Sequence, residues 1–270
     1  MHDIRLVGFD GDDTLWRSED YYRAAEKRYE EIIGRYIDLH DAGTLRHLLE
    51  VERRNLKVFG YGVKGMTLSM IEAAIELTEA RISARDLQQV VDIGRDTLAH
   101  PVELLDGIRD AVEAVAARWQ VVLVTKGDLF HQEDKIARSG LADLFPRNET
   151  TPEKHPPPPP KPASDLRASG LAALAPRIEI VSEKDPRTSA RVLAEFGIGA
   201  EQFVMVGNSL RSDIEPVVRL GGWGVHIPYA LTWAHEADHG LAEAHPRVRT
   251  VASAAELPEA IARIAAGTAA

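Results

Sequence analysis

The stretch that decides the fold is Asp10-Gly11-Asp12-Asp13-Thr14-Leu15, which directly follows the apolar run Ile4-Arg5-Leu6-Val7-Gly8-Phe9. The apolar run is typical of a buried β-strand. Carboxylates at positions 10 and 12 raise each other's pKa unless a cation or hydrogen bonds stabilise their charges. A nucleophile beside a general acid, sharing a metal ion, is one arrangement that needs this spacing. A simple helix-capping turn has the same composition, so the interpretation depends on motifs further along the chain.

The composition is that of a globular protein. The chain has 270 residues, 44% of them hydrophobic and 27% charged, enough for one large domain or two modest ones. Its formal net charge of −10 argues against general binding of nucleic acid, and the lack of cysteine excludes disulfides and thiolate chemistry. The sequence has neither a signal-peptide pattern nor an apolar run long enough to span a membrane. We therefore expect a cytoplasmic protein.

Further apolar runs indicate more strands, and helical patterns lie between most of them. Alternation of apolar strands with helices predicts an α/β fold, with a doubly wound parallel sheet covered by helices on both faces. Ligands bind such sheets at the carboxyl ends of the strands, where the Asp10 cluster stands. The further strands are expected at 120–124, 177–181, 203–206 and 223–227, with a weaker one at 248–251, and the core helices at 106–118, 187–196 and 212–220.

Residues 17–99 differ from the rest because apolar residues recur there at helical spacing in four stripes, with no convincing strand. The pattern predicts a small all-helical domain inserted after the first strand. Residues 1–16 and 100–270 then form the core domain. A glycine-rich loop, Gly60 to Gly65, separates two of the inserted helices.

A proline-rich segment interrupts the core between residues 146 and 176. It contains five consecutive prolines, Pro156 to Pro160. Such a stretch is extended and cannot join a helix or a central strand, so we expect an exposed insertion. A spacer is the more frequent role of such a tract, and a ligand for a proline-binding domain is the alternative.

Polar side chains stand at the ends of three further strands. Thr125-Lys126-Gly127 offers a hydroxyl and backbone N–H groups to an anion, although such turns are common. Lys184 comes after the next strand and is suited to hold an anionic intermediate, although a lone lysine is usually a surface residue. Asn208 and Asp213 come after the fourth strand and carry the hard oxygen atoms that Mg²⁺ prefers, although a helix cap explains the same sequence.

Four successive strand ends thus carry Asp/Asp, Thr, Lys and Asn/Asp, in that order. Together they resemble the haloacid dehalogenase-like (HAD) hydrolase superfamily, over most of residues 1–16 and 100–230. In that family the position of the helical insert at 17–99 is that of a cap, called C1, which closes over the site. The resemblance therefore implies a Rossmann-like core with a helical cap.

The resemblance also implies roles. Asp10 would be the nucleophile that forms an aspartyl-phosphate, and Asp12 would protonate the leaving oxygen and then activate water. Thr125 would bind the phosphoryl group with the backbone of Lys126 and Gly127, and Lys184 would neutralise charge. Mg²⁺ would lie between Asp10, the backbone carbonyl of Asp12 and the motif that contains Asn208 and Asp213.

One departure concerns the metal, because members of the family often have a carboxylate where Asn208 stands. An amide oxygen still binds Mg²⁺ but brings no charge, so Asp213 is expected to carry more of that role. The cap is expected to select the leaving group. We expect the loop Gly60 to Gly65 to face the pocket, with Lys64 meeting the distal part of the substrate.

The leading interpretation is a Mg²⁺-dependent phosphatase that hydrolyses a small phosphomonoester. A 2-haloacid dehalogenase is the second, but dehalogenases of the family depart from aspartate at the position of Asp12. A phosphomutase is the third, and a non-catalytic protein that interacts through the proline tract is the fourth. The intact Asp10, Asp12, Thr125 and Lys184 argue against the fourth interpretation. The expected partner is a phosphorylated small molecule, with neither nucleic acid nor membrane.

Overall fold

The computed structural model of the chain describes residues 1–39, 43–145, 178–231, 233, 236, 239–241 and 245–267. The predicted proline-rich insertion at 146–176 lies outside the described residues. Across the described ranges, none of the helices has both the length and the apolar character needed to cross a membrane.

The predicted strands are all present, with small shifts at their ends. They form one parallel sheet in the order β3-β2-β1-β4-β5-β6. The α/β fold class is confirmed. The strands are β1 (Leu6–Phe9), β2 (Gln120–Lys126), β3 (Ile178–Val181), β4 (Phe203–Gly207), β5 (Trp223–His226) and β6 (Val248–Thr250).

The strand order reverses at β1. The chain runs from β1 outward to β2 and β3, and then returns to place β4 on the other side of β1. A crevice forms at the carboxyl ends of the strands where such a reversal occurs. Asp10 directly follows β1 and Asn208 directly follows β4, so the reversal brings these two residues to one crevice.

Helices cover both faces of the sheet, as the continuous apolar strands require. On one face Phe9, Leu123 and Val206 pack with α6 (Ile108–Ala116), α7 (Leu129–Ser139) and α10 (Leu257–Ala266). On the other face α8 (Pro186–Phe196) and α9 (Glu215–Arg219) pack against Leu6 and Met205. The sequence patterns did not predict α7 and α10.

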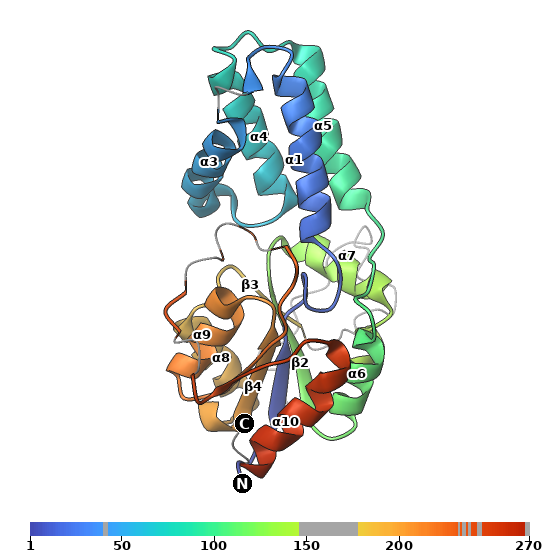
Figure 1. The fold of residues 1–270 in the computed structure, drawn as a ribbon, viewed down its shortest axis with the longest axis vertical. Helices are drawn as coiled ribbons and strands as arrows, with labels where there is room; N and C mark the ends of the chain where they lie inside the picture. Colours follow the sequence, from blue (N-terminus) through green and yellow to red (C-terminus); the bar gives the residue numbers. More distant parts are fainter. Residues whose placement is uncertain are drawn as a thin grey trace, which may run out of the picture.

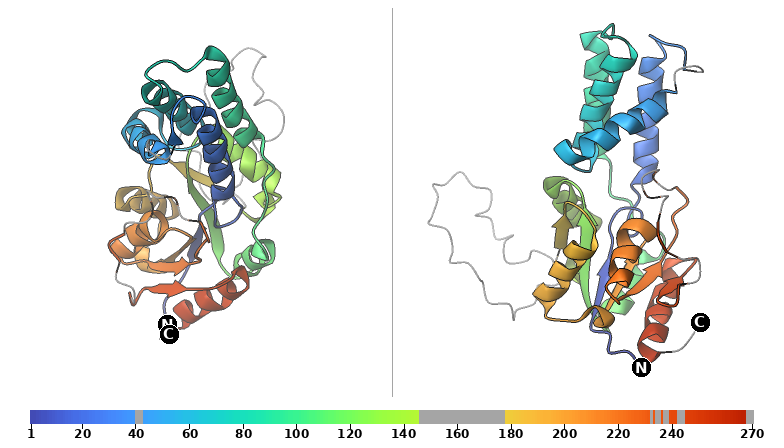
Figure 2. Two further views of the ribbon diagram at one scale, coloured as in Figure 1. Left: turned by 45° about the horizontal axis from the view of Figure 1, so that its top comes forward. Right: turned by 90° about the vertical axis from the view of Figure 1, so that its left-hand side faces the viewer.

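The helices between β1 and β2 form a separate layer with its own hydrophobic cluster, built around Tyr29, Val51, Met70 and Val90. Figure 1 shows this layer above the carboxyl ends of the strands, and the side view in Figure 2 shows the same separation. The helical cap is therefore present. Its helices are α1 (Glu19–Ile33), α3 (Thr44–Phe59), α4 (Val63–Leu77) and α5 (Ala84–Ala99).

Two local predictions need correction. The glycine-rich loop is shorter than expected, because α4 already begins at Val63 and Lys64 lies in its first turn. The helix expected at 212–220 is divided into a π-helical turn, Leu210–Ile214, and the short α9. The π-helical turn contains Asp213, whose carboxylate accepts a hydrogen bond from the backbone N–H of Ser209.

Candidate active site

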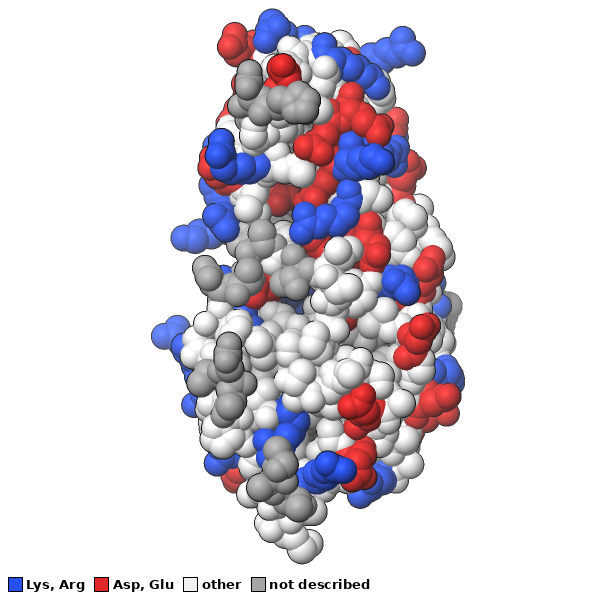
Figure 3. All heavy atoms as spheres, viewed as in Figure 1, with Lys and Arg blue, Asp and Glu red and all other residues white. Residues whose placement is uncertain are grey.

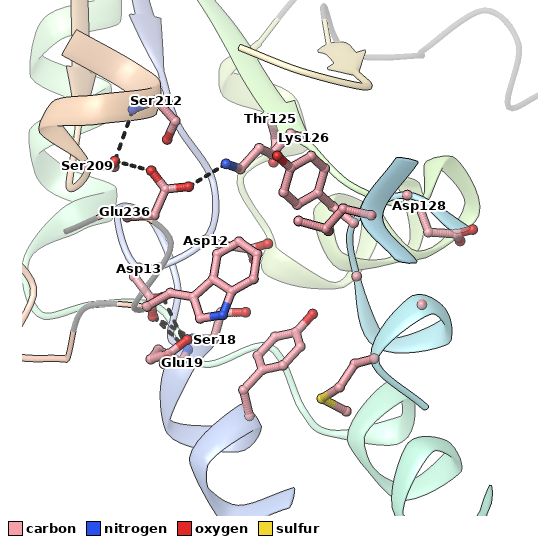
Figure 4. A pocket seen from close by; sticks show the side chains of 18 of the residues that line it. Asp12, Asp13, Ser18, Glu19, Thr125, Lys126, Asp128, Ser209, Ser212 and Glu236 are labelled. Carbon is pink, nitrogen blue, oxygen red and sulfur yellow. Dashed lines mark hydrogen bonds and ion pairs between the residues drawn. The ribbon is translucent and has the colours of Figure 1, made fainter. Parts of the chain in front are cut away.

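The loop after β1 is wound tightly around the carbonyl oxygen of Gly11, which accepts hydrogen bonds from the backbone N–H groups of Thr14, Leu15 and Trp16. Asp13 has a φ of 61°, in the left-handed region that lets the chain turn back. Its carboxylate accepts from the backbone N–H groups of Ser18 and Glu19 and so caps α1 (Figure 4). The short loop thereby joins the core directly to the first cap helix.

Asp10 shares a buried ammonium group with Asp213. Lys184 Nζ contacts Asp10 Oδ1 and lies 2.7 Å from Asp213 Oδ1. Burial raises the pKa of Asp10, and the Asp213 carboxylate adds to this against the opposing charge of Lys184, so that it reaches about 7. Burial works against the charged form of Lys184, but the two carboxylates outweigh it and raise its pKa. Two carboxylates therefore share one cation.

Gly207 makes room for this arrangement. A Cβ atom at residue 207 would lie 2.3 Å from Asp213 Oδ2, so any side chain there would displace the carboxylate. Asp213 Oδ2 accepts from the backbone N–H of Ser209 at 2.9 Å, and Oδ1 is held by Lys184. Lys184 and the Ser209 backbone thus orient both oxygens of Asp213.

Asp12 is held from three sides. Its Oδ1 accepts from Trp16 Nε1 at 2.7 Å and pairs with Lys135 Nζ at 2.5 Å. Its Oδ2 accepts from Gln132 Nε2 at 2.9 Å. Burial alone would raise the pKa of Asp12, but the charge and hydrogen bond of Lys135, with the other two bonds, outweigh it and lower the pKa to about 2. In this arrangement Asp12 is a carboxylate at neutral pH.

The second strand end supplies a hydroxyl to the same place. Thr125 is 1% exposed and lines the cavity between core and cap, and within the described residues its hydroxyl makes no hydrogen bond. Lys126 pairs with Glu236 (Figure 4), and its ammonium lies 4.5 Å from the centroid of the Tyr61 ring. Gly127 does not line the cavity and instead adjoins Gln132 Nε2.

A carboxylate oxygen of Asp10 and the amide oxygen of Asn208 both lie beside the hydroxyl of Thr14. Thr14 Oγ1 lies 3.0 Å from Asp10 Oδ2 and 3.1 Å from Asn208 Oδ1, and it accepts from the Asn208 backbone N–H at 3.0 Å. Across the described part of the chain, no three His, Cys, Asp or Glu side chains meet as a ready-made metal centre. The donors nevertheless fit Mg²⁺, which binds to one or two carboxylates and keeps several waters. A second cation also suits a site in which two carboxylates share one lysine.

A cavity of about 160 Å³ lies between these strand ends and the cap. Core residues Asp10, Asp12, Thr125, Lys184 and Asn208 all line it. From the cap it is lined by residues of α1, α3, α4 and the loop between α3 and α4, which includes Gly60, Tyr61 and Gly62. The four strand ends singled out in the sequence are therefore brought together, and the loop that comes after α3 faces them.

Lys64 lies elsewhere. Its Nζ pairs with Asp128 Oδ1 at 2.9 Å, and 53% of its side chain is exposed. Asp128 is the N-cap of α7, where it accepts from the His131 backbone N–H. Contrary to the prediction, Lys64 itself does not line the cavity, but its partner Asp128 does, so Lys64 joins the cap to the rim of the cavity.

A family model described as haloacid dehalogenase-like hydrolase matches residues 4–221. This chain belongs to the haloacid dehalogenase-like hydrolase family. The match spans all four strand-end motifs and the helical cap. The resemblance that those motifs indicated is thus confirmed, and the HAD fold accounts for the site at the strand reversal.

Solved structures agree with this assignment. A haloacid dehalogenase-like hydrolase from Xanthomonas campestris is 54% identical over 98% of this chain and 94% of that one, with a TM-score of 0.79. A 2-haloacid dehalogenase from Pseudomonas syringae (19% identity, 96% and 99% covered, TM-score 0.53) shares the fold. So does the magnesium-bound HAD-hydrolase YfnB from Bacillus subtilis (15% identity, 96% and 98% covered, TM-score 0.57). A search of curated protein sequences gives no match.

Several residues of this HAD site were not predicted from the sequence. Gln132 and Lys135 lie three residues apart on α7, and this spacing on one helical face was the available signal. No sequence pattern indicated Glu236 as a site residue, because its partner Lys126 lies far away along the chain. The cap carboxylates Glu19 and Glu52 have the sequence pattern of a solvated helix surface.

Proposed function

We propose that this HAD hydrolase is a Mg²⁺-dependent phosphatase that hydrolyses a small phosphomonoester through an aspartyl-phosphate on Asp10. The observation that supports this best is the pairing of Asp10 with the buried ammonium of Lys184, in the cavity that Asp12 and Thr125 also line. A carboxylate needs no base to become a nucleophile, and a fixed cation beside it stabilises the charge that the phosphoryl group brings.

In the first step, an oxygen of Asp10 forms a bond to phosphorus while the bond to the leaving oxygen breaks. Asp12 gives a proton to that oxygen, and the alcohol leaves. In the second step, water attacks phosphorus, Asp12 takes its proton, and the Asp10 carboxylate is released with inorganic phosphate. The hydroxyl of Thr125 and the ammonium of Lys184 bind the phosphoryl oxygens in both steps.

Asp12 must be protonated before it can act as the general acid. While Lys135 holds Asp12 as a carboxylate, Asp12 is ready to act as a base but has no proton to donate. We infer that substrate binding weakens this ion pair so that Asp12 takes up a proton before the first step. The phosphoryl group's own negative charge favours that protonation.

Mg²⁺, when bound, would reduce the repulsion between the phosphate and the carboxylates. Asp10 and Asn208 would hold it with the backbone carbonyl of Asp12. Asp213 lines the same cavity and holds Lys184 beside Asp10, so it would add a further carboxylate to the metal site.

A 2-haloacid dehalogenase is the second candidate, and Asn208 is the residue that favours it. An amide in place of a carboxylate removes charge from the metal site, and attack on carbon needs no metal. Asp12 argues against this candidate, since that chemistry needs no acid at that position.

The deciding experiment measures turnover of an aryl phosphate by the full chain, with Mg²⁺ and with excess chelator, beside halide release from 2-chloropropionate. We expect hydrolysis of the aryl phosphate that is lost with chelator and restored by Mg²⁺. Halide release without aryl phosphate turnover would replace the phosphatase with the dehalogenase. Equal aryl phosphate turnover with and without metal would contradict the metal-dependent mechanism.

A further inference from the structure

The lining of the cavity is acidic. Carboxylates outnumber lysines by nine to two among the described residues of the cavity lining, and no arginine belongs to it. Both lysines are already paired, Lys184 with Asp10 and Asp213, and Lys126 with Glu236. Figure 3 shows acidic and basic side chains side by side on one outer face of the cap, so the excess of acid is a property of the cavity and not of that surface.

Three of these carboxylates come from the cap, and two of them share one cation. Arg23 pairs with Glu19 at 3.0 Å and with Glu26 at 3.0 Å. Glu52 makes neither a hydrogen bond nor an ion pair within the described ranges. Burial, and then the charges of Glu26 and Glu19, raise the pKa of Glu52 to about 7 against the opposing charge of Arg23. Glu52 therefore has no ion-pair partner of its own among the described residues, although the charge of Arg23 reaches it.

Asn55 lies one helical turn after Glu52 on α3 and offers a second acceptor. It lines the cavity and is only 8% exposed. Its Nδ2 donates to Ser69 Oγ at 3.2 Å and to Glu72 Oε2 at 2.5 Å, and Ser69 Oγ donates onward to the carbonyl of Gly65. Both amide hydrogens are therefore used, and Asn55 can meet a ligand only through Oδ1, as an acceptor.

An acceptor amide beside an unpaired carboxylate is complementary to a positively charged N–H donor. Tyr22 lines the same cavity as Asp10 and Glu52. Aromatic faces also attract cations. A phosphate at Asp10 and a cation at Glu52 would thus be the two ends of one ligand.

We propose that the phosphomonoester carries a protonated amine on its leaving group, and that Glu52 and Asn55 bind this ammonium at the cap end of the cavity. The proposal rests on the proposed phosphatase function and adds the class of substrate. It also explains why an enzyme for an anionic substrate has an acidic pocket: the anion is held at Lys184, and the acidic wall receives the other end.

The test compares pairs of substrates in which an ammonium group replaces a methyl group of similar size. The full chain with Mg²⁺ is assayed on aminoethyl phosphate against propyl phosphate, and on aminopropyl phosphate against butyl phosphate. At least one pair should show a kcat/KM about tenfold higher for the amine, the ratio that a charged hydrogen bond typically contributes. Choline phosphate, which has no N–H donor on its nitrogen, should lose most of that preference.

The variant Glu52→Gln should reduce the preference for the amine at least about threefold, as expected when a hydrogen bond loses its charge. Glu50→Gln is the matched control, because Glu50 is an exposed residue of the same helix and the charge change is identical. It should keep the wild-type ratio.

The outcomes separate the two proposals. No metal-dependent turnover of an aryl phosphate would overturn the phosphatase itself. Turnover of the aryl phosphate without preference for either amine, or a preference that Glu52→Gln retains, would overturn the ammonium site alone. An equal preference for choline phosphate would overturn the hydrogen-bonding role of Asn55.

Discussion

Lys135 of α7 forms an ion pair with Asp12 of the β1 loop, with Nζ 2.5 Å from Oδ1 and only 9% of the lysine side chain exposed. This contact links the helix after the second strand end to the residue proposed as general acid and base. It fixes both the direction and the charge of the Asp12 carboxylate. The role of Asp12 therefore depends on a residue outside the four strand-end motifs.

Replacing Lys135 with methionine should leave the Asp12 carboxylate without its counter-charge in a mostly buried place. We expect a loss of about 2 to 4 kcal/mol in the free energy of unfolding at pH 7, measured with urea. The pKa of Asp12 is lowered from 3.8 to about 2, so the ion pair stabilises the folded state fully above pH 3.8 and loses this effect as Asp12 is protonated toward pH 2. The difference in stability between the variant and the wild type should therefore shrink as the pH falls below 5. Arg138→Met on the same helix should cost less, and equal losses in both variants would contradict a special role for Lys135.

Asp10→Asn should lower aryl phosphate turnover by several orders of magnitude, because an amide is a poor nucleophile. Lys184 keeps Asp213 as its partner in this variant, so the fold should persist. Steady-state rates and the melting temperature should be measured on the same sample. Residual turnover near the wild-type rate would exclude Asp10 as the nucleophile.

Asn208→Asp should lower the Mg²⁺ concentration that gives half-maximal activity, because it adds a negative charge beside Asp10 Oδ2. A magnesium titration of turnover measures this directly. Asn208→Ser serves as the control without added charge and should raise the half-maximal concentration. An unchanged value in both variants would mean that residue 208 does not face the ion.

Glu52→Gln should stabilise the protein at alkaline pH. The pKa of Glu52 is raised to about 7 from 4.5, so the folded state binds its proton more tightly, and stability falls as the pH rises between these values. Removing the titratable group removes that loss, which amounts to about 1 to 3 kcal/mol for a shift of this size. The melting temperature of the variant, relative to that of the wild type, should rise from pH 5 to pH 8. A difference in melting temperature that stays constant over this range would contradict the prediction.

Lys64→Ala should have a small effect on stability, below about 1 kcal/mol, because more than half of its side chain is exposed in its ion pair with Asp128. Since Lys64 does not line the cavity, kcat/KM should change equally for all phosphates. Parallel assays on the aryl phosphate and the aminoalkyl phosphates would measure this. A loss confined to one substrate would return Lys64 to the substrate site.

The strands could be predicted because each carries its own local signal. A continuous apolar run such as Val121–Val124 has to be buried on both faces, and this burial is visible in the sequence without knowledge of any neighbour. These strands form one parallel sheet, and parallel strands all have their carboxyl ends at the same edge. The residues at or just after the strand ends therefore lie close together there, and they are Asp10, Thr125, Lys184 and Asn208. The helical character of the cap was visible for the same reason.

The contacts of the side chains at that edge were decided only by tertiary structure. The sequence predicts Asp213 as a metal ligand but does not show that Lys184 and the Ser209 backbone orient its two oxygens. It predicts Asp12 as an acid, yet Lys135 lowers the pKa of that carboxyl. Lys64 lies outside the cavity lining, whereas Glu52 and Asn55 belong to it, because the angle at which the cap helices sit on the core sets these directions. Hydrophobic periodicity fixes which residues are buried, whereas the partners of a charge depend on contacts between segments far apart in the chain.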